Sequence, residues 1–135
     1  MSDTTPQIFN PAHLHDPTPN GYSTAVIAPA GNRLAFISGQ GGQDERGNLS
    51  PDFAKQVGQA YANLGAVLAA MNARPDQVLK LCVYVVDHDM SKLGILTQAV
   101  TAMFGDTLPA QTLIGVSKLA IDPMMFEVEA IVALA

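Results

Sequence analysis

The chain has 135 residues, 48% of them apolar, and carries a formal charge of −5. This size and composition suit a single domain, residues 1–135, whose core needs neither metals nor disulfides. The Lys and Arg residues are scattered and no apolar run approaches the roughly 20 residues that cross a membrane, which argues against nucleic-acid and membrane partners.

The N-terminal part of the chain combines turn-rich loops with two expected strands. Residues 1–6 lack the basic segment and apolar stretch of a signal peptide, so we expect a cytoplasmic protein. Residues 22–28 and 34–38 have the composition of strands. The Pro-Ala-Gly-Asn connection at residues 29–32 supplies turn chemistry, which predicts that the two strands pair as an antiparallel hairpin.

The clearest helical pattern lies in residues 53–71. Its apolar residues recur at helical spacing and are Phe53, Val57, Ala60, Tyr61, Leu64, Val67, Leu68 and Met71. Ser50 is placed to cap this helix and Pro51 suits its first position, while Asn72 and Pro75 mark its end. A second stripe of small residues, which we expect to pack closely against a sheet, consists of Gly58, Ala62, Gly65 and Ala69.

The second half of the chain alternates strands with a second helix. Residues 78–86 are almost continuously apolar, which is typical of a strand covered on both faces. Within this run the lone Cys82 is expected to be a small buried hydrophobe. A helix follows at residues 90–104, and the last strands lie near residues 111–117 and 125–134. The order ββαβαββ predicts an α+β fold.

The number of helices predicts self-association. Two helices cover one face of a sheet, yet residues 78–86 and 131–134 are apolar toward both faces. A closed, symmetric oligomer in which the open sheet faces meet would cover the second face. The alternative, a monomer with a large apolar surface, is rare among soluble proteins.

Glycines follow the second expected strand in the run Ser-Gly-Gln-Gly-Gly-Gln at residues 38–43. No Gly-Lys-Ser/Thr follows the run, so it is not a phosphate-binding loop. The run indicates either a bulged strand end or, at Gly39, backbone N–H groups that are exposed to a ligand.

Three histidines raise the question of a metal site. His13, His15 and His88 lie in expected loops, and His88 is flanked by two aspartates. Their spacing matches no specific metal motif, so we expect neither a metal nor another cofactor.

Two carboxylates near the C-terminus are more informative. The two-residue period of a strand places Glu127 and Glu129 on one face and their apolar neighbours on the other. Paired carboxylates on a partly apolar face suit general acid–base chemistry. A solvated strand face at a rim is the alternative interpretation.

Short motifs stand in a characteristic order from about residue 22 to the C-terminus. They are Gly21-Tyr22-Ser23, Ile37-Ser38-Gly39-Gln40, Gln59 with Asn63-Leu64, residues 78–87, Pro109-Ala110 and Phe126-Glu127-Val128-Glu129-Ala130-Ile131. In these motifs the chain resembles the RidA family, also called YjgF or L-PSP. The resemblance implies a chorismate-mutase-like fold, a homotrimer with its sheets facing inward, and three ligand pockets between subunits.

The resemblance also implies a function. The best-known members hydrolyse reactive 2-imino or enamine acids to 2-keto acids and ammonia, using a bound water and no cofactor or metal. By position, Glu129 matches the carboxylate that holds this water and is the expected catalytic residue. The expected substrate-binding residues are Tyr22, Gly39, Gln111, Thr112 and Glu127. The family's endoribonuclease label has no support in the acidic composition.

One departure from the family pattern concerns substrate recognition. Members carry an arginine directly after Pro-Ala, which binds the substrate carboxylate through two hydrogen bonds, but here that position is Gln111. Thr97 and Val100 also replace a usual Asn and Tyr, and Leu113 replaces a frequent Cys. These departures indicate a divergent branch with a changed ligand.

We therefore expect a hydrolytic deaminase-type enzyme that acts on a small imine- or enamine-like metabolite in a cleft between subunits. A non-catalytic trimer that binds or senses a small molecule in the same cleft is the alternative. Whether Arg33, Arg46 or Lys118 of a neighbouring subunit restores the missing charge stays open at this point.

Overall fold

Four strands form one mixed sheet in the spatial order β3-β6-β4-β5. They are β3 (Arg33–Gly41), β4 (Val78–Val86), β5 (Ala110–Val116) and β6 (Phe126–Leu134), and the computed structural model describes residues 5–135. β6 runs antiparallel to both of its neighbours, whereas β4 and β5 are parallel. Parallel strands need a crossover connection, which a helix between β4 and β5 supplies.

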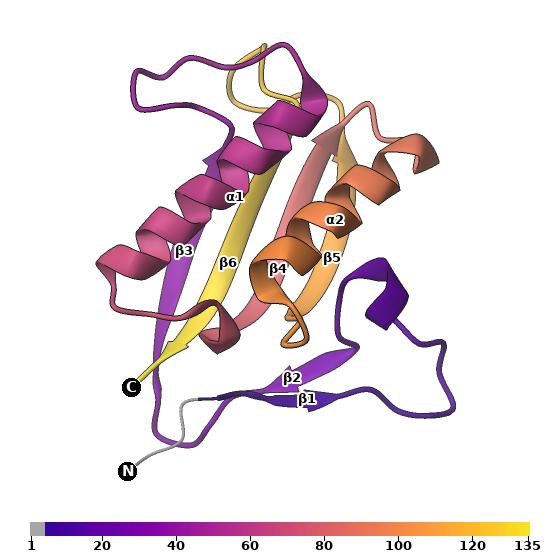
Figure 1. Cartoon of the computed structure of the whole chain (residues 1–135), viewed down its shortest axis with the longest axis vertical. Helices are drawn as coiled ribbons and strands as arrows, with labels where there is room; N and C mark the ends of the chain where they lie inside the picture. The colour runs from indigo at the N-terminus through magenta and orange to yellow at the C-terminus, as the bar shows by residue number, and fades with distance from the viewer. Residues whose placement is uncertain (1–4) are drawn as a thin grey trace.

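Both helices, α1 (Phe53–Ala70) and α2 (Leu93–Phe104), lie on the same face of this sheet (Figure 1). The core fills the space between the helices and the sheet. Its least exposed side chains include Val57, Leu64 and Leu68 of α1 and Leu81, Val83, Val85, Phe126, Val128 and Val132 of the sheet. The α+β class and the placement of two helices on one face are confirmed.

The predicted hairpin of residues 22–28 and 34–38 is wrong. β2 (Ala25–Ile27) instead pairs with β1 (Gln7–Phe9), a strand that the sequence pattern did not predict, and the two form a separate ribbon. β3 pairs with β6. The nine residues of β6 offer β3 a long partner that also buries Ile37, whereas β2 has three residues and none of them is buried. Turn chemistry sets where the chain reverses but not which strand it joins.

α1 follows the predicted apolar pattern from Phe53, but its N-cap differs from the prediction. Asp52, rather than Ser50, is its N-cap, because the Asp52 carboxylate accepts a hydrogen bond of 3.0 Å from a backbone N–H of the first turn. Ser50 instead accepts a hydrogen bond of 3.1 Å from the backbone N–H of Asp52, so Pro51 precedes the helix. Asn72 follows the helix with a φ of 56°, in the left-handed conformation that often ends helices.

The stripe of small residues on α1 does not contact the sheet, contrary to expectation. A Cβ on Gly58 would meet no atom within 4 Å, and one on Gly65 would meet Met103 of α2 at 3.7 Å. Ala62 and Ala69 are exposed. The larger apolar stripe occupies the side of α1 that faces the sheet, so the small residues are turned away from it.

The remaining elements agree closely with the sequence prediction. β4 has the predicted bounds. β5 and β6 each begin and end within one residue of their own predicted bounds. The predicted second helix begins as a 3-10 turn, η3 (Met90–Lys92), before α2. Two further 3-10 turns are η1 (Thr18–Asn20) and η2 (Pro75–Gln77). No helix within residues 5–135 is long and apolar enough to cross a membrane.

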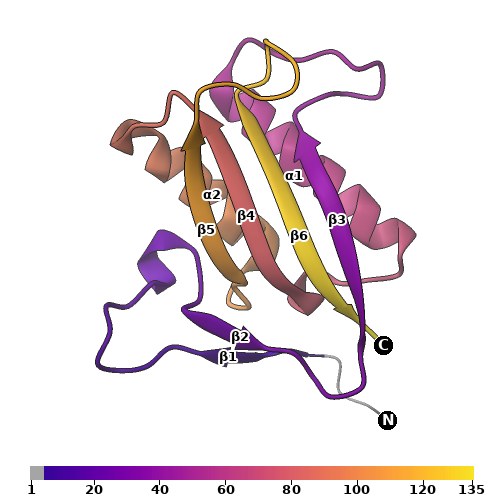
Figure 2. The same cartoon turned by 180° about the vertical axis from the view of Figure 1, so that it is seen from behind.

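The opposite face of the sheet carries no helix, and we call it the open face (Figure 2). By strand register its side chains are Leu34 and Phe36 of β3, Lys80, Cys82 and Tyr84 of β4, Thr112 and Ile114 of β5, and Glu127, Glu129 and Ile131 of β6. Phe36 is 73% exposed, Leu34 49% and Ile114 41%. The open face is therefore mixed, and β4 is not apolar toward both faces as predicted, because it presents Lys80, Cys82 and Tyr84 there; the exposed apolar side chains belong to β3 and β5.

Candidate functional site

Residues 10–24, which connect β1 with β2, are called the N-terminal arm here. Tyr22 is positioned by a contact between this arm and the start of β5. The backbone N–H of Ser23 donates to the Pro109 carbonyl at 3.0 Å, and its side chain donates to the Leu108 carbonyl. The preceding Gly21 has a φ of 84°, which favours glycine, and a Cβ there would lie 2.6 Å from Val100. The arm is thereby fixed against α2 and β5, which brings Tyr22 next to β5.

A first hollow, the edge hollow, lies where this arm meets β5 and α2. It has a volume of about 390 Å³ and is lined by Asn20, Tyr22, Leu93, Thr97, Gln111, Thr112 and Leu113. Three of the predicted substrate-binding residues, Tyr22, Gln111 and Thr112, therefore come together. Thr97 and Leu113, two of the departures from the family pattern, line the same hollow.

Gln111 faces the helix side of the sheet. It pairs with Leu81, which is fully buried beneath the helices. The Oε1 atom of Gln111 is buried and has no hydrogen-bond partner within residues 5–135. A buried amide oxygen without a donor is costly, so a donor from a ligand or a second copy would stabilise this site.

His15 contacts Tyr22, a residue that lines the edge hollow, and the sequence analysis did not predict this contact. Its Nε2 lies 2.8 Å from the Tyr22 hydroxyl, and the two rings meet edge to face. The sequence analysis placed His15 in an expected loop, and nothing local in the sequence connects it with Tyr22. The hydrogen bond between His15 and Tyr22 forms because the arm folds back on itself, which brings together two residues that are seven positions apart.

A second hollow, the sheet-face hollow, lies on the open face between β4 and β6. It has a volume of about 220 Å³ and is lined by Lys80, Cys82, Glu129, Ala130 and Ile131. Cys82 pairs directly with Glu129 and is half-buried. The expectation of a buried, purely structural cysteine is therefore wrong, because Cys82 alternates with core residues and faces away from the helices.

Glu129 has a hydrogen-bond donor that the sequence analysis did not identify. The Tyr84 hydroxyl donates to Glu129 Oε1. The neighbouring Cys82 and, after it, this bond to Glu129 raise the pKa of Tyr84, so the phenol stays protonated and can act as a donor at neutral pH. Strand alternation could have placed Tyr84 on the open face, but its pairing with β6 is a long-range feature.

Gly39 and Glu127 form a further contact of the open face. β3 is bulged between Ile37 and Gln40, as the glycines there suggested. A Cβ on Gly39 would lie 1.7 Å from Glu127 Oε1, so the carboxylate occupies the space above the glycine. The two predicted substrate-binding residues are therefore neighbours, although they are distant in sequence.

Within one chain, the predicted site residues divide between two sides of the sheet. Gln111 faces the helices, whereas Glu129 lies on the open face. Thr112 connects the two groups, because it lines the edge hollow and its Oγ1 accepts a hydrogen bond of 2.8 Å from Lys80. Gln111 could therefore approach a Glu129 carboxylate directly only if that carboxylate belonged to another copy.

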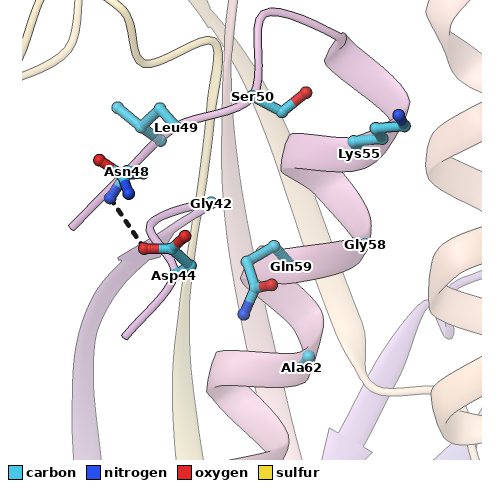
Figure 3. Close-up of a pocket in the computed structure, with 9 residues that line it drawn as sticks. All are labelled: Gly42, Asp44, Asn48, Leu49, Ser50, Lys55, Gly58, Gln59 and Ala62. Carbon is cyan, nitrogen blue, oxygen red and sulfur yellow. Dashed lines mark hydrogen bonds between the residues drawn. The ribbon is translucent and has the colours of Figure 1, made fainter. Parts of the chain in front are cut away.

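A third hollow lies beside the first turns of α1, beneath the loop of residues 42–50 (Figure 3). It has a volume of about 640 Å³ and is lined by Gly42, Asp44, Asn48, Leu49, Ser50, Lys55, Gly58, Gln59 and Ala62. Asp44 already accepts backbone hydrogen bonds of 2.9 Å from Arg46 and Asn48, so its carboxylate shapes the loop. None of the predicted site residues lines this hollow.

The three histidines line none of these hollows, and neither do Arg33, Arg46 and Lys118, the cations that the sequence analysis considered. No group of three or more His, Cys, Asp or Glu residues in the described chain could hold a metal. Arg33 donates to the Ala135 carbonyl at 3.1 and 3.2 Å. Lys118 lies 3.7 Å from Asp122 on the surface, and Arg46 is exposed in a loop.

These features define a small α+β protein with polar hollows at one edge and on the open face of its sheet. The chain belongs to the RidA/YjgF family, since the family described as Endoribonuclease L-PSP matches residues 14–134. This confirms the resemblance seen in the sequence. The chain is 33% identical over 99 residues to the RutC family protein YjgH of Escherichia coli, which covers 73% of each chain.

Solved structures give the same assignment. A protein of unknown function of the conserved Rid family, YyfB from Yersinia pestis, matches with a TM-score of 0.91 and 32% identity, over 96% of this chain and 99% of that chain. RidA from an Antarctic Psychrobacter matches with a TM-score of 0.69 and 27% identity, over 98% of this chain and 99% of that chain. The fold is that of the family over nearly its full length.

Proposed function

We propose that this protein is a hydrolytic deaminase-type enzyme that acts on a small imine- or enamine-like metabolite, with Glu129 as its catalytic residue. One observation carries the proposal: the Glu129 carboxylate lines a hollow and is held by the Tyr84 hydroxyl. A carboxylate oriented in this way can fix a water molecule and accept its proton. The family relationship supports the reaction class.

The proposed reaction needs no cofactor. Glu129 accepts a proton from water as the water oxygen adds to the carbon of the C=N bond, and the imine nitrogen takes up a proton. In the resulting carbinolamine the nitrogen takes the proton held by Glu129, and the C–N bond breaks to release ammonia. The hydroxyl oxygen loses its proton to solvent and becomes a carbonyl. Water and imine are consumed, and ketone and ammonia are formed.

We further propose that the active unit is a homotrimer whose open faces meet. An exposed face with Phe36 and Leu34 needs a cover, and a second copy is the cover that the family relationship supports. Assembly would also let the edge hollow of one copy, with Gln111 and Tyr22, approach the Glu129 carboxylate of another. A cleft of this kind would exclude bulk water around the reacting imine.

The test is ammonia release from 2-imino acids that an amino-acid oxidase generates in the assay. The native chain and Gln111→Arg are compared under identical conditions. Ammonia release by the native chain above the spontaneous rate supports the proposal. Release by Gln111→Arg alone would mean that the site is intact but serves a substrate other than a 2-imino acid.

Absence of release from both proteins would favour the alternative, a non-catalytic trimer that binds a small molecule. The Gln111 amide gives this alternative a structural basis, because its unpartnered Oε1 can accept a hydrogen bond from a neutral ligand. Ligand binding without turnover would then be the expected behaviour.

A further inference from the structure

We propose that Lys80 supplies the cation that binds the anionic end of the substrate in the sheet-face hollow. The inference rests on the proposed function and narrows its substrate class to imines that carry a carboxylate. Lys80 would take over the charge that the chain lacks at Gln111, although it lies on a different strand and on the other face of the sheet.

The first support is the position of Lys80. Lys80 precedes Cys82 by two residues on β4, so both side chains lie on the open face and line the same hollow. Lys80 pairs near Ile131, and Cys82 pairs with Glu129. Lys80 and Glu129 are therefore diagonal neighbours, at a spacing of roughly 7 Å between their backbones. Both side chains line the same hollow of about 220 Å³, so a small ligand in it can contact both.

The second support is the lack of charge compensation around Lys80. Its Nζ donates to Thr112 Oγ1, a neutral acceptor, at 2.8 Å. The ion pairs within residues 5–135 are Arg74–Asp76 and Lys118–Asp122, so no carboxylate lies within 4.0 Å of Lys80 Nζ. An ammonium has three donors, and two of them remain for a ligand.

The third support comes from covering the open face. A second copy on this face would desolvate Lys80, and an ammonium that is desolvated without a partner is strongly unfavourable. A ligand carboxylate that accepts from the two remaining donors of the Lys80 ammonium would provide the missing charge. Within residues 5–135, Lys80 is the one cation that lines either the edge hollow or the sheet-face hollow.

Isothermal titration calorimetry with two matched probes tests this inference. The probes are 2-oxobutanoate and its uncharged amide, 2-oxobutanamide. We expect the native chain to bind the anion more tightly, and Lys80→Met to weaken anion binding by roughly 10- to 100-fold while leaving the amide unchanged. Lys80→Arg should retain the preference for the anion. Lys118→Met, a surface control, should behave as the native chain does.

Two results would overturn the inference. One is unchanged binding of 2-oxobutanoate by Lys80→Met. The other is native protein that does not prefer the anion to the amide, and this comparison stays decisive even if Lys80→Met fails to assemble.

The catalytic proposal fails separately. Selective binding of 2-oxobutanoate through Lys80 without ammonia release would uphold Lys80 and refute the hydrolase. If Lys80→Met releases ammonia with unchanged kcat and KM, the hydrolase is upheld and the role of Lys80 is refuted.

Discussion

Tyr84 donates its hydroxyl hydrogen to Glu129, which is its diagonal neighbour across β4 and β6, rather than to Glu127, which pairs with it directly. Glu127 instead extends over Gly39 on the other side of β6. The two carboxylates share one face of β6, as the two-residue period predicted, but they are directed toward different strands. Their surroundings therefore differ: Glu129 lines the sheet-face hollow, and Glu127 fills the space above the β3 bulge.

Replacing Glu129 with Gln should remove turnover while leaving the fold intact. The amide can still accept the Tyr84 hydrogen bond, but it cannot accept a proton from water. We expect kcat for ammonia release to fall by roughly 100-fold or more. Glu45→Gln, in an exposed loop, is the matched control and should retain native activity. A fully active Glu129→Gln protein would show that another group handles the proton.

A methyl group on Gly39 should displace the Glu127 side chain. Gly39→Ala places a Cβ where Glu127 Oε1 now lies, and because Gly39 has no positive φ its backbone accepts alanine. We expect reduced affinity for the substrate with a correctly folded chain. Gly58→Ala is the control, since a Cβ there meets no atom within 4 Å. That control should increase the free energy of unfolding by roughly 0.4–1 kcal/mol, measured by urea denaturation.

The double variant Gly39→Ala, Glu127→Ala separates the two explanations for such a result. If the loss in Gly39→Ala arises from the collision with Glu127, the second substitution removes the colliding atoms and adds no further loss. Additive effects of the two changes would indicate that Gly39 acts independently of Glu127, for example because a methyl group obstructs the approach of a ligand to the backbone N–H.

The stability of the native chain should fall at alkaline pH because of Tyr84. Its pKa is raised above the ordinary value of 10.0 by Cys82 and Glu129, and burial raises the pKa of Tyr61 as well. The unfolded tyrosines lose their protons near pH 10 while the folded ones keep theirs. Their stabilising contribution is therefore complete below about pH 10 and is lost as the pH rises further.

Urea unfolding at about pH 8 and about pH 11 measures this effect. Tyr84→Phe should show a smaller loss of unfolding free energy between the two conditions than the native chain, because it has one raised tyrosine fewer. An equal loss in both proteins would mean that Cys82 and Glu129 do not raise the pKa of Tyr84 in solution.

An acidic side chain on the open face should prevent assembly. Phe36 is the most exposed of the large apolar residues that β3 presents there, so Phe36→Asp would place a charge in the proposed interface. We expect the native chain to elute as a trimer and Phe36→Asp as a monomer in size-exclusion chromatography with light scattering. Ala66→Asp, on an exposed position of α1, should remain trimeric. A monomeric native chain would refute the proposed assembly.

The sequence by itself determined the elements that depend on local periodicity. The apolar stripe from Phe53 to Met71 specified α1, and the β-branched run at Val78–Val86 specified β4, because each pattern has only one way to bury its apolar side chains. Alternation in β6 placed Glu127 and Glu129 on one face for the same reason. The motif order identified the family, and the absence of the arginine at Gln111 was visible directly.

Only the tertiary structure decided which strands pair and which polar groups meet. The turn before β3 suggested pairing with β2, but burial of Ile37 against the core joined β3 to β6 instead. The bond between His15 and Tyr22 needs the N-terminal arm to fold back, and the one between Tyr84 and Glu129 needs β4 beside β6. These contacts depend on the competition among all possible strand partners, which is settled by burial over the whole chain and not by any local pattern.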